Sequence, residues 1–196
     1  MNVAEATGVL FAIAYLVLAI RESRWCWPAG IASSLVFLGV FWAAGLYMQA
    51  ALHVFYAGMG AYGWWAWRPG GGHAAPAVIH RWPLRRHALA VAAIVASGLL
   101  AGALLARYTA AEMPYVDALV SAGAVFTTWL VARKVLENWY YWFVIDAATL
   151  FLALGQGLYQ TAALFAGYLV LVVLGWRQWS QSLRRQARDG MQASHG

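Results

Sequence analysis

Seven long apolar stretches constrain the fold of this chain more than any other feature of its sequence. A helix needs about 20 mostly apolar residues to cross a bilayer. Stretches of this kind lie at 3–20, 26–43, 46–67, 88–106, 114–132, 138–155 and 157–176. Hydrophobic residues make up 63% of the chain and charged residues only 10%, which excludes a soluble globular enzyme and a disordered chain. The sequence predicts an all-α integral membrane protein with seven transmembrane helices.

The positive charges predict how these helices are oriented. If all seven stretches cross the membrane, Arg107 alone falls on one side and the other 12 of the 13 Lys and Arg residues fall on the opposite side. Cytoplasmic loops are enriched in Lys and Arg, so we expect the N-terminus outside and the C-terminus in the cytoplasm. The net charge of +6 then reflects topology and contact with anionic lipids, and no nucleic-acid partner is expected.

An internal repeat organises the chain. Residues 21–67 align with residues 133–179 at an offset of 112, without a gap, and 13 of 47 positions are identical. The identical pairs include Trp27/Trp139, Gly45/Gly157, Tyr56/Tyr168, Gly63/Gly175, Trp64/Trp176 and Trp67/Trp179. Each repeat holds three predicted helices, and one unmatched helix between them restores the orientation of the second copy. The sequence therefore predicts two parallel three-helix repeats joined by a linker helix (3+1+3), an architecture typical of SWEET-like transporters.

This repeat divides the chain into five parts. They are a first repeat at 1–67, a basic cytoplasmic loop at 68–87, a linker helix at 88–106, a second repeat at 114–179 and a polar cytoplasmic tail at 180–196 that we expect to be disordered. In the linker helix, Gly98 and Gly102 have the spacing of a close helix-packing motif. Packing within the chain is favoured over an oligomer seam, because this motif is common in membrane helices.

No enzyme motif or metal-ligand cluster stands out, and the candidates for function are therefore the polar side chains inside the predicted helices. Asp146 lies eight residues into its helix, or about 12 Å at 1.5 Å per residue, near the middle of the membrane. Trp139, Trp142 and Asp146 are spaced i, i+3 and i+7 and share one helix face. Two indoles leading to a carboxylate suit a flat cationic ligand. The alternative is an interfacial tryptophan belt with a structural Asp146.

A second polar stripe runs along the third predicted helix. Gln49, His53 and Tyr56 are spaced i, i+4 and i+7, and they either line the same site from the first repeat or form hydrogen bonds between helices. Ser34 is the repeat counterpart of Asp146, which makes it a further binding candidate, although buried serines often bond their own backbone. We predict no catalytic residue, no metal site and no cofactor.

The segment from Trp139 to Asp146 resembles the Trp-x-x-Trp-x-x-x-Asn/Asp motif of the PnuC family of vitamin transporters. The resemblance extends to the turns and aromatic residues at 45–47, 62–67, 157–159 and 175–177, and it covers about residues 5–180. It implies a SWEET-like bundle in a bacterial inner membrane that imports nicotinamide riboside by facilitated diffusion, with a cytoplasmic kinase trapping the product. It also implies a homo-oligomer, with a trimer as the first candidate.

The resemblance further implies that Trp139, Trp142 and Asp146 contact substrate. Related proteins often carry Asp and Gln early in the third helix, where this chain has Gln49 and His53. This difference affects which substrate is expected, but it does not affect which family the chain resembles. Thiamine, also a flat cation, and neutral riboflavin are alternatives within the family. A sugar uniporter and a membrane scaffold that does not transport are the alternatives outside it.

Overall fold

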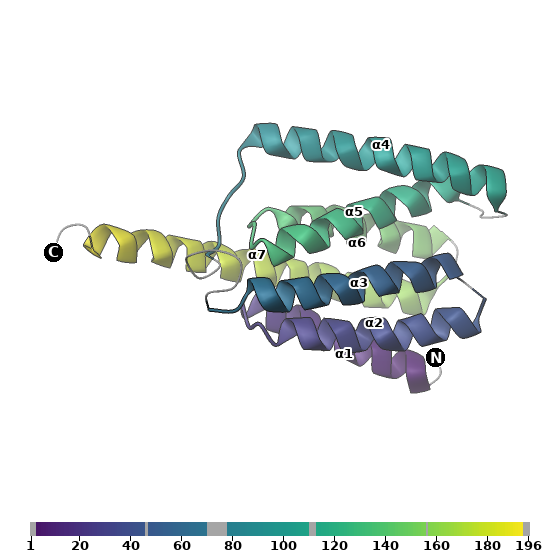
Figure 1. Ribbon diagram of the computed structural model, residues 1–196, viewed down its shortest axis with the longest axis horizontal. Helices are drawn as coiled ribbons and strands as arrows, with labels where there is room; N and C mark the ends of the chain where they lie inside the picture. The colour runs from purple at the N-terminus through teal and green to yellow at the C-terminus, as the bar shows by residue number, and fades with distance from the viewer. Residues whose placement is uncertain (1–2, 46, 70–77, 110–112, 156, 194–196) are drawn as a thin grey trace. The chain divides into compact units, whose positions relative to one another are not determined.

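The computed structural model describes the chain apart from residues 1–2, 46, 70–77, 110–112, 156 and 194–196. The described residues form seven α-helices, as the sequence predicts (Figure 1). They are α1 (Val3–Ile20), α2 (Cys26–Ala43), α3 (Tyr47–Ala66), α4 (Leu84–Tyr108), α5 (Pro114–Ala132), α6 (Asn138–Gly155) and α7 (Tyr159–Ala193). Within the described residues, α1, α2, α4, α5 and α7 are long and apolar enough to cross a membrane. The remaining two, α3 and α6, carry most of the predicted polar site residues.

Two helices are longer than the sequence predicts. α4 begins at Leu84 rather than at 88, directly after Pro83, whose fixed φ and missing N–H suit the start of a helix. α7 continues to Ala193, so the prediction of a disordered tail is wrong for residues 180–193. This segment is rich in Gln, Arg and Ala, which are good helix formers, and polarity alone does not end a helix that has already started. Part of the predicted basic loop, residues 70–77, lies outside the described residues.

The helices form two compact units. Unit 1 comprises Met1–Ile79, Val131–Lys134 and Arg177–Gly196, and unit 2 comprises His80–Leu130 and Val135–Trp176. Unit 1 therefore holds α1, α2, α3 and the end of α7. Unit 2 holds α4, α6, most of α5 and the first half of α7.

In unit 1, α2 packs against both α1 and α3, and Trp27 fills the space between them. Trp27 is only 1% exposed, and its ring makes edge contacts with Tyr15 of α1 (ring centroids 5.9 Å apart) and with Trp67, the residue after α3 (5.4 Å). The ring lies directly over Gly63, where a Cβ atom would be 2.2 Å from the indole. α3 can approach α2 this closely only because position 63 has no side chain.

Unit 2 repeats this packing with the matching pair of residues. Trp139 of α6 is 1% exposed, and a Cβ atom at Gly175 of α7 would lie 2.4 Å from its ring. The small residues of the linker helix are also used inside the chain. Cβ atoms at Gly98 and Gly102 would each lie 2.6 Å from a side chain of α5, which confirms packing within the chain over an oligomer seam.

The helix ends of the two repeats also match. Gly45 and Gly157 have φ values of 73° and 71° and end α2 and α6 in the left-handed conformation that glycine adopts most easily. Both glycines belong to the segments 45–47 and 157–159 that carry the family resemblance. Glu22 and Lys134, another repeat pair, take the same conformation after α1 and α5, with φ values of 56° and 52°. A left-handed conformation costs a non-glycine residue roughly 1–2 kcal/mol, so these two positions tolerate strain that glycine would relieve.

Large apolar side chains cover much of the outer surface. On α4 alone, Leu89, Leu99, Leu100 and Leu104 are between 48% and 67% exposed. A row of exposed leucines on one helix would be unfavourable in water but is expected where lipid surrounds the helix. The fold is therefore consistent with a bilayer environment, as the composition predicts.

The Trp–Gly packing generates a stability prediction. We expect Gly63→Ala and Gly175→Ala each to destabilise the protein by about 1–3 kcal/mol, because the added methyl group overlaps a buried indole. Thermal unfolding of the purified protein in detergent measures the effect. The matched controls are Gly58→Ala in α3 and Gly167→Ala in α7, where a Cβ atom meets nothing within 4 Å. If all four variants melt alike, close packing at Gly63 and Gly175 is not what holds these helices together.

Candidate functional site

Asp146 is the central candidate in unit 2. It lies in the middle of α6 and is only 5% exposed, and among the described residues no hydrogen bond or ion pair compensates for this burial. The hydroxyl of Tyr168 on α7 is close enough to Asp146 to interact with it electrostatically. An ionised carboxylate at the centre of a membrane helix costs about 2.5–3.5 kcal/mol on insertion scales. A ligand that supplies a positive charge or hydrogen-bond donors would recover that free energy.

The two tryptophans predicted beside Asp146 differ in how they are packed. Trp139 is buried under Gly175 and forms part of the α6–α7 contact. Trp142, one turn closer to Asp146, is only half-buried, so its ring can meet a ligand without opening the helix packing. Trp142 and Asp146 share one face of α6, and a role for the two in binding remains a prediction. Stacking of substrate on Trp139 remains a prediction.

The candidates of the first repeat lie in unit 1. His53 of α3 is surrounded by the rings of Phe37 and Phe41 from α2 and Tyr56 from α3, with centroid distances of 5.4, 5.3 and 5.7 Å. Its Nδ1 atom is buried and has no hydrogen-bond partner among the described residues. Ser34 is 6% exposed on α2. These contacts group His53 and Tyr56 in one aromatic cluster.

Gln49 departs from the predicted stripe. It lies near the start of α3 and is exposed, whereas His53 and Tyr56 are partly buried one and two turns further on. Helical spacing places the three residues on one face, but the degree of burial changes along that face. The structure therefore supports a shared environment for His53 and Tyr56 and leaves Gln49 as a prediction.

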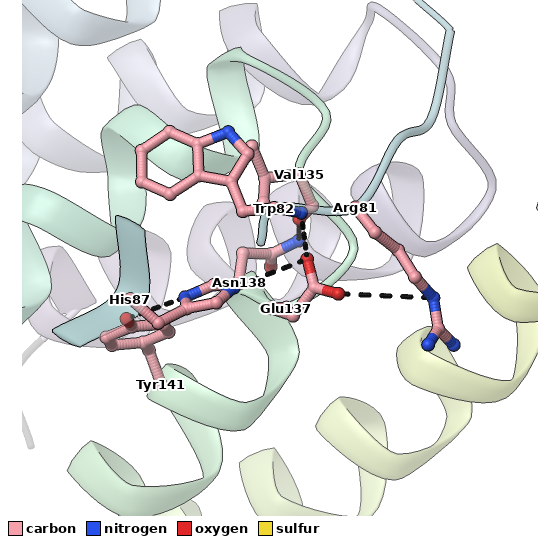
Figure 2. A network of polar contacts seen from close by, with 7 residues as sticks. All are labelled: Arg81, Trp82, His87, Val135, Glu137, Asn138 and Tyr141. Atoms are coloured by element: carbon pink, nitrogen blue, oxygen red, sulfur yellow. Dashed lines mark hydrogen bonds and ion pairs between the residues drawn. The ribbon is translucent and has the colours of Figure 1, made fainter. Parts of the chain in front are cut away.

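A polar network around Glu137 is the main feature that the sequence analysis missed (Figure 2). Glu137 immediately precedes α6, and its Oε2 atom accepts a hydrogen bond from the backbone N–H of Trp82 (3.2 Å). The same oxygen lies 3.8 Å from Nε2 of His87, and Oε1 lies 4.0 Å from Nε of Arg81. The other ring nitrogen of His87 is 3.0 Å from the hydroxyl of Tyr141. This network attaches the segment before α4 to the beginning of α6.

Backbone pairing reinforces the attachment. His80 and Val135 form an isolated parallel bridge, and the N–H of Leu136 donates to the carbonyl of His80 at 2.9 Å. Asn138, which is fully buried, donates to the carbonyl of Val135 at 2.7 Å. The available signal was the carboxylate of Glu137 placed just before a helix N-terminus, where a negative charge is favourable. Its partners are about 50 residues away in sequence, and no local pattern identifies them.

Comparison with known proteins adds evidence from related sequences. The family model described as "Nicotinamide mononucleotide transporter" matches residues 2–181. The riboflavin/roseoflavin transporter RibM of Streptomyces davaonensis is 28% identical over 196 residues, covering 97% of this chain and 90% of RibM. The nicotinamide riboside transporter PnuC of Escherichia coli K12 is 25% identical over 207 residues, covering 93% of this chain and 87% of PnuC.

A solved structure shows the same fold. The crystal structure of the vitamin B3 transporter PnuC superposes with a TM-score of 0.74 at 18% identity, covering 93% of this chain and 82% of that one. The proteins that match along nearly the whole chain are membrane transporters rather than enzymes, and the resemblance noted at the motif from Trp139 to Asp146 is confirmed. The chain belongs to the nicotinamide mononucleotide transporter family.

Proposed function

We propose that this protein imports a vitamin across a bacterial inner membrane by facilitated diffusion, with nicotinamide riboside as the first candidate substrate. The observation that carries the proposal is Asp146, a buried carboxylate without a hydrogen bond or ion pair among the described residues. Nicotinamide riboside is a flat cation, so its ring can stack on Trp142 while its charge is balanced by Asp146. Thiamine offers the same chemistry and stays an alternative.

The proposed architecture is the 3+1+3 arrangement with all seven helices crossing the membrane. It is supported by the identical turn geometry at Gly45 and Gly157 and by the same Trp–Gly packing in both repeats. The excess of Lys and Arg on one side supports an N-terminus outside and a C-terminus in the cytoplasm. A homo-oligomer is part of the proposal from family resemblance.

Passive transport is supported by the scarcity of ionisable groups inside the helices. Among the described helix centres, His53 and Asp146 are the residues able to carry a proton, and they do not form a chain suited to a proton relay. Net import then requires removal of the substrate inside the cell. Phosphorylation by a cytoplasmic kinase is the trap that we propose.

Riboflavin is the second candidate. It is favoured by the 28% identity to the riboflavin/roseoflavin transporter RibM, which extends over 97% of this chain. Riboflavin is neutral, so Asp146 would then act as a hydrogen-bond acceptor for sugar-alcohol hydroxyls and Trp142 would stack on the ring system. The cationic candidate requires the charge of Asp146 and riboflavin does not, and that difference can be measured.

Transport by the purified protein in liposomes tests the proposal directly. We expect labelled nicotinamide riboside or riboflavin to equilibrate across the membrane and not to accumulate beyond the outside concentration, because no gradient is coupled to it. Glucose should not enter, and liposomes without protein provide the background. Uphill accumulation driven by a pH or sodium gradient would contradict passive transport. Failure of nicotinamide riboside, thiamine and riboflavin alike would contradict the proposed function.

Removing the charge of Asp146 distinguishes the candidates. For a cationic substrate, we expect Asp146→Asn to weaken binding by more than about 1 kcal/mol, roughly sixfold, because a desolvated charge contact is lost. For riboflavin, the amide keeps a hydrogen-bond acceptor and affinity should change less than threefold. Asp117→Asn, at an exposed position near the start of α5, is the matched control. Unchanged affinity for a cationic substrate would show that Asp146 is not its counter-charge.

Trp142 provides the test of stacking. Trp142→Ala should weaken binding of either vitamin more than Trp142→Phe does, because phenylalanine keeps a flat ring and alanine removes the stacking surface. Affinity per folded molecule is measured by calorimetry, with thermal stability recorded on the same samples. If alanine lowers the melting temperature but leaves the affinity intact, Trp142 packs in the fold and does not contact the substrate.

A further inference from the structure

Two buried indoles at one end of unit 1 make reciprocal hydrogen bonds between the repeats. Trp67 of the first repeat donates its Nε1–H to the carbonyl of Ala132, the last residue of α5, at 3.0 Å. Trp179 of the second repeat donates to the carbonyl of Ala19, at the end of α1, also at 3.0 Å. Trp67 and Trp179 are repeat counterparts, and each reaches the final turn of the first helix of the other repeat. Their rings lie 6.1 Å apart.

An ion pair lies beside these indoles and joins another pair of repeat counterparts. The Nζ atom of Lys134 is 3.6 Å from Oε2 of Glu22, and the two side chains are only 12% and 20% exposed. The same ammonium group lies 4.7 Å above the ring of Trp67. Each of these residues therefore meets its own counterpart, as expected if a local two-fold axis passes between the repeats at this point.

The choice of residues at this axis is unusual. Glu22 and Lys134 have the positive φ that Gly45 and Gly157 adopt at the other matched turns, so glycine would suit the backbone better. A strict repeat would place two identical charges face to face, and these would repel. The chain instead carries opposite charges. Burial lowers the pKa of Lys134, while the Glu22 carboxylate acts in the opposite direction.

The chemistry of this cluster suits a contact that opens and closes. Indole N–H groups, helix-end carbonyls, an ammonium and a carboxylate are all readily hydrated, so none of them stays buried and unpaired when the contact separates. When the contact closes, the same groups satisfy one another. Polar contacts of this kind stabilise the closed arrangement of the two repeats but still allow them to separate.

We propose that Ala19, Glu22, Trp67, Ala132, Lys134 and Trp179 form a gate between the two repeats. This gate is closed in the structure, and its opening releases substrate at the basic end of the molecule. The gate rests on the proposed function, because only a transporter must part its repeats to release a substrate. In the proposed orientation this end faces the cytoplasm, so gate opening completes import.

A reversible cross-link tests the gate. In a Cys26→Ala background, Glu22→Cys and Lys134→Cys are joined with a short reducible thiol cross-linker, and uptake of nicotinamide riboside and of riboflavin into liposomes is measured. We expect cross-linking to lower uptake at least tenfold and reduction to restore it. The control pair is Arg24→Cys with Trp64→Cys, which are in contact at the same end but both within the first repeat; its cross-link should leave uptake unchanged. Equal uptake by the cross-linked and reduced Glu22/Lys134 pair would overturn the gate.

A spectroscopic measurement tests the gate independently of the substrate. Spin labels at Arg68→Cys and Gln181→Cys, both exposed in unit 1 beside the two indoles, report the distance between repeats in vitamin-free liposomes. Trp67→Phe with Trp179→Phe keeps both rings but removes both N–H donors, so the fraction of molecules at a longer distance should rise at least threefold. If the parent and the Trp67→Phe/Trp179→Phe variant both show the same single narrow distance, the gate is overturned. This outcome is independent of the proposed function, which fails separately if the uncross-linked protein transports neither nicotinamide riboside nor riboflavin.

Discussion

The fit of one indole ring onto one glycine, made once in each repeat, determines much of the rest of this structure. In unit 2, Trp139 against Gly175 fixes the rotation of α6 about its own axis. Because Trp139, Trp142 and Asp146 share one helix face, that rotation also fixes the direction of the two residues further along. Asp146 is therefore turned toward α7, consistent with its electrostatic interaction with Tyr168. Packing of Trp139 against Gly175 thus helps to place a carboxylate at a buried position on α6.

The repeat supplies the scaffold, and the positions where its copies differ supply the chemistry. Trp27 and Trp139 pack alike, and Gly45 and Gly157 turn alike. By contrast, Asp146 replaces Ser34, and Phe165 replaces His53, so each copy has its own polar group near the middle of its helices. At the basic end, Glu22 faces Lys134 where identical residues would repel. Divergence between the copies therefore marks the candidate site and the gate more clearly than their identity does.

The sequence was sufficient to predict what depends on local pattern. Seven helices, both hairpin glycines and the use of Gly98 and Gly102 in packing all follow from apolar length, turn chemistry and spacing, and the structure confirms them. Spacing alone did not separate Trp139 from Trp142, because it identifies a shared face and not which side chain meets a glycine on the next helix. The partners of Glu137 and the reciprocal bonds of Trp67 and Trp179 join residues between 50 and 160 positions apart. Such contacts are decided by tertiary packing, which no sequence window records.

The burial of Asp146 also bears on how tightly a passive transporter can hold its substrate. A carboxylate held without a partner raises the free energy of the empty protein by about 2.5–3.5 kcal/mol, equivalent to a factor of roughly 100 in affinity. If the empty state of Asp146 is neutral, the charge must form when a cation binds, and the same free energy is spent at that point. In this second case, part of the attraction between substrate and carboxylate offsets the burial and does not appear as net affinity, whereas an Asp146 already ionised in the empty protein returns the burial free energy as affinity. A cation is then recognised specifically against neutral molecules, yet it leaves readily when the path opens. This combination of selectivity with modest affinity is what transport without a driving gradient requires.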